Sequence, residues 1–255
     1  MRVVRIEGPN EPLYGRVIED TVQLVAAPPY EGWEPVDDHI KLADARLLAP
    51  VTPSKIVGVG RNYRDHIDEM GFEVPAWPSV FLKPPTSIIG PGGTVVLPPA
   101  SSRVEHEAEL AVVIGRRARH VTPHRALDHV FGYTCANDVS ARDIQLADTA
   151  PVRAKGFDSF CPIGPWIETD LDISYGVEVR CRVNGELRQQ GNTAQLVFDV
   201  PYLISDLSSV MTLLPGDVIL TGTPDGCTAL RPGDAVTIEI DGLGELAHSV
   251  AASKS

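Results

Sequence analysis

Glycine and proline recur along the whole chain and limit how long any regular element can be. The sequence has 22 glycines and 22 prolines among 255 residues, and they are spread over its length rather than gathered in one tract. Both residues interrupt helices and strands and favour turns. The chain therefore predicts many short strands joined by turns, with only a few helices.

The N-terminal part has the pattern of a small β-rich unit. Apolar and β-branched residues bounded by turn residues predict strands at 2–6, 13–18 and 22–25, followed by a loop at 28–35. A further strand at 55–59 begins after Pro50 and Pro53. We therefore predict a small N-terminal domain of residues 1–50 and a larger domain of residues 51–255.

The remainder of the chain alternates strands and turns, with a few helical segments. We expect helices over 62–70, from Thr122 to Gly132 and over 201–211, and a hairpin at the Asn184-Gly185 turn. No GxGxxG motif follows a strand and no GxxxxGK[ST] motif occurs, so a nucleotide-binding fold is not expected. The pattern favours an α+β fold in which β-structure dominates.

The charge balance and the cysteine spacing restrict the partners and the compartment. The chain has 34 acidic and 22 basic residues, a net charge of −12, which disfavours binding to nucleic acid or to anionic lipid. No run approaches the roughly 18 apolar residues of a membrane-spanning helix, and the N-terminus lacks a signal-peptide pattern. The four cysteines form no CxxC pair. We expect a cytoplasmic protein with no nucleic-acid or membrane partner.

Three acidic residues form a candidate metal site. Glu107 and Glu109 are two positions apart at the start of an apolar strand, so both point to one face, and Asp138 ends an otherwise uncharged stretch. Three oxygen ligands without Cys or His suit Mg²⁺, Mn²⁺ or Ca²⁺. Alternation in a half-exposed strand is the simpler explanation of the glutamates. The metal hypothesis requires the carboxylates to converge with no Lys or Arg head group between them.

Two further features have both a catalytic and an ordinary explanation. His66 and Glu69 are three residues apart on a predicted helix, so Glu69 can orient the imidazole, although a solvated helix face explains the same pattern. Lys155 lies between small residues and could bind a substrate carboxylate, although an exposed surface lysine is more common.

Many short strings of the sequence, taken together, resemble the fumarylacetoacetate hydrolase family. They occur in the family's order between about residues 54 and 250 and include VGRNYRDH with EMG at 59–71, FLKP at 81–84, HEAELAVVIG at 106–115, NDVSARD at 137–143, KGFD at 155–158 and GDVILTGTP at 216–224. The resemblance implies a mixed β-sandwich roll for the larger domain, a variable small N-terminal part, and a homodimer.

The resemblance also implies roles for individual residues. Glu107, Glu109 and Asp138 match the family's ligands for Mg²⁺ or Mn²⁺, and His66 with Glu69 matches the pair that activates water in hydrolytic members. Lys155 and Gln145 match polar groups near the reacting carbonyl. The positions that match the family's pocket lining are Arg61, Asn62, Lys83, Arg142, Thr221, Gly222 and Thr223.

The implied activity is metal-dependent chemistry on small 2-oxo or 2,4-dioxo acids through an enolate. C–C hydrolysis of acylpyruvates, isomerisation and decarboxylation in aromatic catabolism all share that step. Oxaloacetate decarboxylation is an alternative, and a non-catalytic metabolite-binding protein is an alternative of another class. The chain departs from the family at 148–153, which lacks a common Trp, and at 225–229, where the loop sequence differs. Both departures leave the tail of the substrate open.

Overall fold

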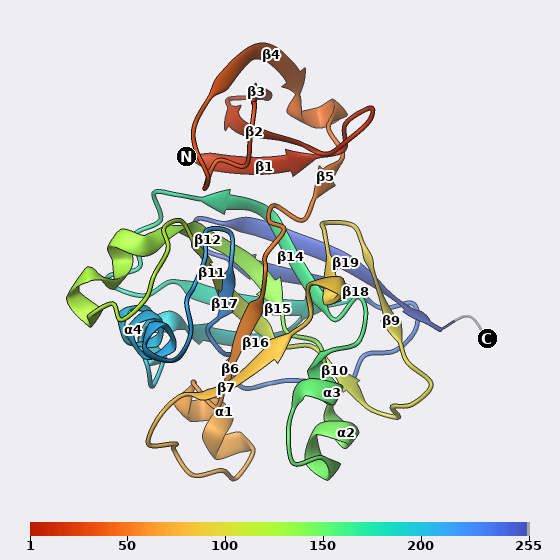
Figure 1. The fold of residues 1–255 in the computed structure, drawn as a ribbon. Coiled ribbons are helices and arrows are strands. Elements are labelled where there is room, and N and C mark those ends of the chain that lie inside the picture. The colour runs from red at the N-terminus through yellow and green to blue at the C-terminus, as the bar shows by residue number, and fades with distance from the viewer. Residues whose placement is uncertain (254–255) are drawn as a thin grey trace.

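Three β-sheets form the framework of the structure, a computed structural model that describes residues 1–253 (Figure 1). The N-terminal strands are β1 (Arg2–Ile6), β2 (Leu13–Ile18), β3 (Thr21–Val25), β4 (Pro35–Lys41) and β5 (Leu47–Leu48), with a 3₁₀ helix at Leu42–Asp44. β1 pairs with β14 (Cys161–Glu168), so these strands extend a twelve-stranded sheet instead of forming a separate one. The domain division at residue 50 stays a prediction.

The rest of the large sheet contains the strands that carry the candidate residues. Its order continues from β14 through β12, β11, β17 and β6 to β7, and β8 pairs with β14. These strands are β6 (Ile56–Gly60), β7 (Ser79–Lys83), β8 (Ile88–Ile89), β11 (Ala108–Ile114), β12 (Val130–Asn137) and β17 (Val218–Leu220).

A second sheet of five strands packs against the large one. It consists of β9 (Thr94–Leu97), β15 (Glu178–Val183), β16 (Glu186–Asn192), β18 (Ala235–Ile240) and β19 (Gly244–Ala252), while β10 (Val104–Glu105) pairs with β13 (Ser140–Ala141). Leu110 and Val112 of β11 share one buried cluster with Val179 and Ile238 of the second sheet. Val113, on the other face of β11, belongs to a different buried cluster. β11 is therefore covered on both faces.

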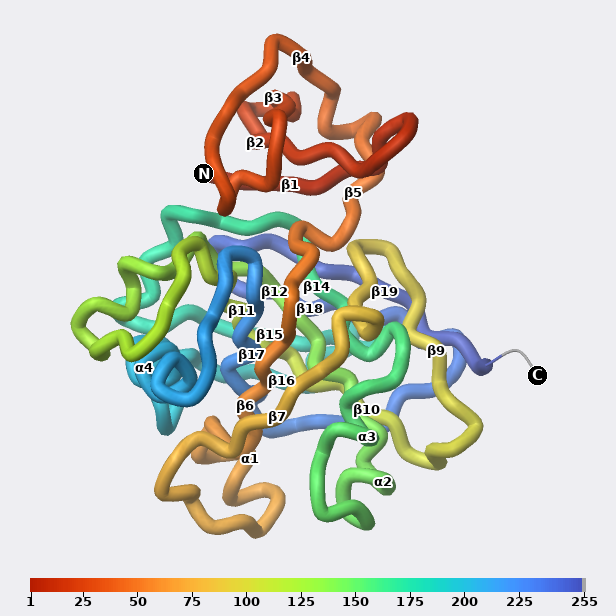
Figure 2. Tube along the Cα trace, viewed as in Figure 1, coloured from red at the N-terminus to blue at the C-terminus, as the bar shows by residue number. Residues whose placement is uncertain are grey.

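The helices are short. They are α1 (Arg64–Glu69), α2 (Arg142–Ala147), α3 (Val152–Lys155) and α4 (Val200–Val210), with further 3₁₀ helices at Pro85–Ser87, Pro123–His129 and Thr193–Gln195. Figure 1 shows α1, α2 and α3 at the end of the molecule opposite the N-terminal strands. In Figure 2 two chain segments frame that end: the orange segment with α1 after β6, and the green segment with α2 and α3.

The predicted β-dominated α+β class is confirmed, and so are several local elements. The strands at 2–6 and 13–18 have the predicted bounds. Asn184 and Gly185, both at positive φ, form the turn between β15 and β16. The helix predicted from Thr122 to Gly132 is wrong, because a 3₁₀ helix ends at His129 and Gly132 lies inside β12. Strand β4, rich in charged residues, was not predicted.

Within residues 1–253, none of the helices combines the length and the apolar character that crossing a membrane requires.

Candidate active site

Three buried carboxylates meet where the beginning of β11 lies beside the end of β12. Glu107 directly precedes β11, Glu109 lies inside it, and Asp138 directly follows β12, while the register pairs Ala108 with Asn137. One oxygen from each carboxylate lies within 4.8 Å of the others, and the three residues are at most 4% exposed. The structure thus brings together the three acidic residues singled out in the sequence, and it does so in the interior rather than on a half-exposed strand.

Two buried lysines contact the same group of carboxylates. Lys155 Nζ donates to Glu107 Oε2 and to Asp138 Oδ2, each at 2.5 Å, and Lys83 Nζ donates to Asp138 Oδ1 at 2.6 Å. The expectation that no Lys or Arg head group lies between the carboxylates is therefore wrong for Glu107 and Asp138, and the metal hypothesis now depends on Glu109, which neither lysine contacts. The physical reason is that buried carboxylates need compensating charge. Lys155 is 2% exposed, so the alternative of a surface lysine is also excluded.

Glu109 is the member of the triad without a cationic contact. Its Oε2 accepts a hydrogen bond from the Gly222 backbone N–H at 2.7 Å, and within residues 1–253 no Lys or Arg forms an ion pair with it. Burial, followed by the negative charges of Asp138 and Glu107, raises the pKa of Glu109 well above its ordinary value. A carboxylate left in this position is short of positive charge, which a bound cation would supply.

The pKa of Glu107 is shifted in the opposite direction from that of Glu109. Burial alone would raise the pKa of Glu107, but the cations of Lys155 and Arg142 outweigh it and hold this pKa well below its ordinary value. Arg142 Nη2 donates to Glu107 Oε1 at 2.5 Å and Arg142 Nε donates to Glu105 Oε2 at 2.6 Å. Asp138 and Glu107 in turn hold the pKa of Lys155 above its ordinary value, against the effect of burial. Glu107 and Lys155 are therefore both charged at neutral pH.

The donor set fits a hard divalent cation. All three side chains offer oxygen, the ligand type that Mg²⁺ and Mn²⁺ prefer, and Glu109 brings a charge that no side chain neutralises by direct contact. Each carboxylate oxygen has two lone pairs, so a cation bound to all three residues would share oxygens with Lys155 or displace its ammonium group.

The predicted pair of His66 and Glu69 is present on α1. His66 Nδ1 and Glu69 Oε2 are 3.1 Å apart, and the Gly226 backbone N–H donates to both Glu69 oxygens at 3.2 and 3.3 Å. With Nδ1–H donating to the carboxylate, the lone pair of the neutral ring is on Nε2. His66 is 8% exposed, which contradicts the solvated helix face as an explanation for this residue.

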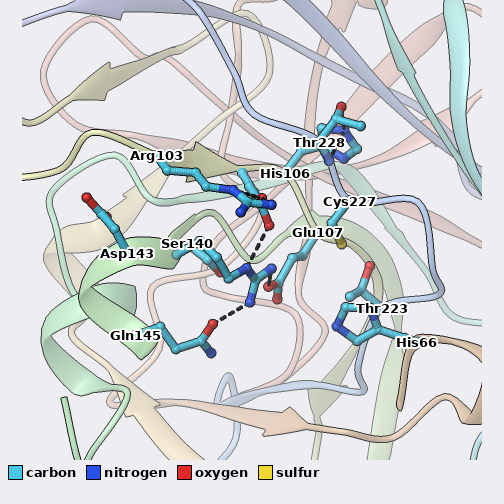
Figure 3. A network of polar contacts seen from close by, with 12 residues as sticks. His66, Arg103, His106, Glu107, Ser140, Asp143, Gln145, Thr223, Cys227 and Thr228 are labelled. Atoms are coloured by element: carbon cyan, nitrogen blue, oxygen red, sulfur yellow. Dashed lines mark hydrogen bonds and ion pairs between the residues drawn. The ribbon is translucent and has the colours of Figure 1, made fainter. Parts of the chain in front are cut away.

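A cavity of about 230 Å³ lies between His66 and two members of the triad, Glu107 and Glu109. His66, Glu107, Glu109 and Lys155 all line it. In Figure 3 His66 and Thr223 lie together on one side of Glu107, and Gln145 lies on the other. The remaining lining residues are Val59, Gly60, Arg61, Phe72, Ser79, Phe81, Arg142, Gln145, Leu146, Asp148, Thr149, Pro151 and Thr223. The lining therefore combines three cations, three carboxylates and several apolar side chains, and Arg142 and Gln145 lie on the side of α2.

The other predicted pocket residues lie behind this lining. The Asn62 side chain donates to the carbonyls of Phe198 and Thr221, and Thr221 Oγ1 donates to the Leu110 carbonyl. Gly222 and Lys83 reach the triad through Glu109 and Asp138 respectively. These residues support the lining, whereas Arg61, Arg142, Gln145 and Thr223 belong to it.

Several residues that shape the site were not singled out in the sequence. Glu105 shares Arg142 with Glu107, and the alternation of Glu105, Glu107 and Glu109 could have indicated it. Phe72 stacks under the Arg61 guanidinium at 4.0 Å. Gln189 contacts both β11 and the loop after β17, and no local pattern marks it.

A buried histidine supports the backbone of Glu107. The Glu107 N–H donates to Asn137 Oδ1 at 2.8 Å, and the Asn137 amide donates to His248 Nε2 at 2.9 Å. Burial lowers the pKa of His248 to about 4. Protonation of Nε2 would remove the acceptor that Asn137 uses.

We expect this histidine to make the folded protein sensitive to acid. As pH falls from about 6.5 to about 4, the unfolded chain takes up a proton at His248 and the folded chain does not, so the free energy of unfolding falls by about 3 kcal/mol through this group. Urea unfolding across this range measures the loss. In His248→Gln, whose amide oxygen can still accept from Asn137, the decline should be shallower. Parallel curves for the two proteins would contradict this.

Nearly the whole chain is similar to known proteins. A family model described as fumarylacetoacetate (FAA) hydrolase C-terminal matches residues 55–251, and one described as Rv2993c-like, N-terminal matches residues 1–50. Protein Rv2993c of Mycobacterium tuberculosis is 45% identical over 98% of both chains. Human mitochondrial oxaloacetate tautomerase FAHD2A is 45% identical over 82% of this chain and 70% of its own. A crystal structure of 5-carboxymethyl-2-hydroxymuconate delta-isomerase from Mycobacterium smegmatis has a TM-score of 0.93 at 45% identity, covering 99% of this chain and 100% of its own.

Proposed function

The chain belongs to the fumarylacetoacetate hydrolase family and is an enzyme, and from this premise we propose that it is a divalent-metal-dependent isomerase that interconverts the keto and enol forms of small 2-oxo dicarboxylic acids. One observation carries the proposal. The same small cavity is lined by Glu107 and Glu109 of the triad, by Lys155, and by His66 of the His66–Glu69 pair.

The cavity suits a small, doubly charged anion. Arg61, Arg142 and Lys155 all line it, and Arg61 has no carboxylate partner within residues 1–253. Its volume of about 230 Å³ lies below the range of drug-sized pockets, which begins at about 300 Å³. Glu107, Glu109 and Asp148 also line the cavity and balance these three cations, so the charge for an anion would come from a divalent cation on the triad together with Arg61. A short dicarboxylate that carries a keto group matches that charge and the size.

His66 is the proposed base. Its Nε2 takes a proton from the carbon next to the keto group, the C–H electron pair forms the C=C bond, and the carbonyl π pair moves to oxygen. Glu69 holds the ring through Nδ1 and stabilises the imidazolium that forms. Lys155 uses two of its three N–H groups on Glu107 and Asp138, so the third can donate to the substrate oxygen.

Glu107, Glu109 and Asp138 are the proposed ligands of Mg²⁺ or Mn²⁺. When bound, the ion would supply Lewis-acid stabilisation of the negative charge on the keto acid. The names of two relatives, an oxaloacetate tautomerase and a delta-isomerase, support isomerisation over hydrolysis as the main reaction.

An assay with three readouts tests the proposal. Enol-oxaloacetate is added to purified protein with Mn²⁺, and the loss of the enol is followed by absorbance. A coupled reaction measures the pyruvate that forms. A parallel sample receives acetylpyruvate, and its cleavage is measured. We expect ketonisation at least about 100-fold faster than in a Mn²⁺-only blank. Pyruvate as the main product would instead indicate oxaloacetate decarboxylation, cleavage of acetylpyruvate would indicate a hydrolase, and binding without turnover would indicate a metabolite-binding protein.

A further inference from the structure

One short loop contacts both the carboxylate triad and the His66–Glu69 pair. The loop 222–226 follows β17, and its first residue, Gly222, donates its N–H to Glu109. Its last residue, Gly226, donates its N–H to the carboxylate of Glu69. Gly226 has a φ of +87°, and a Cβ there would lie 2.2 Å from the Arg188 carbonyl oxygen. The position of this loop therefore sets the position of a triad member and of the residue that orients His66.

Besides the Gly222–Glu109 hydrogen bond, a buried amide links the loop to β11. Gln189 of β16 is 1% exposed, and its Oε1 accepts a hydrogen bond from the Ala108 backbone N–H at 3.1 Å. Ala108 is the residue between Glu107 and Glu109. Its Nε2 donates to Thr223 Oγ1 and to the Pro224 carbonyl, both at 2.8 Å. One side chain thus bridges the strand of the two glutamates and the loop 222–226.

A second contact restricts the Gln189 amide further. His106 Nδ1 lies 2.8 Å from Gln189 Oε1, and His106 Nε2 lies 2.9 Å from Thr228 Oγ1 at the far side of the loop. His106 is fully buried, and both of its ring nitrogens have hydrogen-bond partners, Nδ1 with Gln189 and Nε2 with Thr228. Figure 3 shows His106 against Thr228. The Gln189 amide is therefore held in one orientation.

We propose that Gln189 is a positioning residue that sets the spacing between β11 and the loop 222–226. It thereby aligns Glu109 with Glu107 and Asp138, and Glu69 with His66. It acts through other residues, since it does not line the cavity. The inference rests on the proposed metal-dependent function. Replacing the amide leaves the Ala108 N–H without a partner in the interior and the Pro224 carbonyl with the weak Cys227 thiol donor, so the loop is held less firmly against the strand.

Gln189→Met tests this with Gln190→Met as the matched control. Both variants change a β16 glutamine to an unbranched side chain of similar length, but Gln190 is exposed. We expect Gln189→Met to bind Mn²⁺ about tenfold or more weakly by isothermal titration calorimetry, and Gln190→Met to bind as the wild type does. A purely structural role would lower the free energy of unfolding, measured in EDTA, and leave the Mn²⁺ affinity of the folded protein unchanged.

The outcomes separate the two proposals. If the wild type binds no Mn²⁺, the proposed function and this inference both fail. If the wild type binds and folded Gln189→Met binds equally well, only this inference is overturned. Should Gln189→Met not fold, Gln189→Glu replaces it, because that variant keeps the acceptor toward Ala108 and loses both donors toward the loop. Its added negative charge favours cation binding, so weaker Mn²⁺ binding supports the inference and equal or tighter binding overturns it.

Discussion

Glu109→Gln should weaken Mn²⁺ binding by about 100- to 1000-fold and slow metal-dependent turnover to a similar extent. The amide keeps the shape of the side chain and the acceptor for the Gly222 N–H, so the substitution removes little except the charge. Two unit charges about 4 Å apart interact by about 4 kcal/mol at an effective dielectric constant near 20, and about 1.4 kcal/mol corresponds to tenfold in affinity. Titration calorimetry with Mn²⁺ measures the loss.

The stability of the same variant should change in the other direction. Without metal, Glu109 is repelled by Asp138 and Glu107, which with burial raise its pKa, so Glu109→Gln should unfold at a higher urea concentration than the wild type in EDTA at pH 8. Glu245→Gln, at an exposed position of β19, is the control and should alter neither property. Unchanged Mn²⁺ affinity in a folded Glu109→Gln protein would contradict the assignment of this carboxylate.

His66→Gln should lower the rate of enol–keto conversion by about 100- to 10,000-fold, the usual contribution of a general base. The variant keeps a polar side chain near Glu69 but has no group that accepts a proton near neutral pH. The triad is untouched, so Mn²⁺ affinity should stay at the wild-type value. Stopped-flow absorbance with enol-oxaloacetate measures the rate.

His124→Gln is the matched control for this substitution, because His124 is exposed and lies outside the cavity. Its rate should equal that of the wild type. A His66→Gln protein that converts substrate at the wild-type rate would remove His66 from the mechanism. Such a result, together with formation of pyruvate, would favour decarboxylation, which needs no base to remove a C–H proton.

Local features of the fold were predictable because they depend on neighbouring residues. The turn at Asn184-Gly185 requires positive φ at both positions, which Asn and Gly adopt readily. The carboxylates of Glu107 and Glu109 share a face because side chains alternate along a strand. Asp138 joins them through the pairing of β11 with β12. That pairing is a tertiary fact, and the sequence indicated it only through the family resemblance.

Features that depend on distant contacts were not predictable in the same way. Lys155 has the pattern of a surface residue, and only the folding of α3 against β7 and β13 places its ammonium between Glu107 and Asp138. Gln189 lies in a polar stretch of β16, and its burial follows from the loop after β17. Gly132 has the residue type that ends helices, yet pairing of β12 with β11 and β14 places it inside a strand.

The most direct test of the account is to locate a divalent ion in crystals of the protein soaked with Mn²⁺. The account predicts an anomalous scattering peak in contact with oxygens of Glu107, Glu109 and Asp138. Crystals with no such peak, in which Lys155 still bonds to Glu107 and Asp138 and Glu109 contacts only the Gly222 N–H, would contradict it.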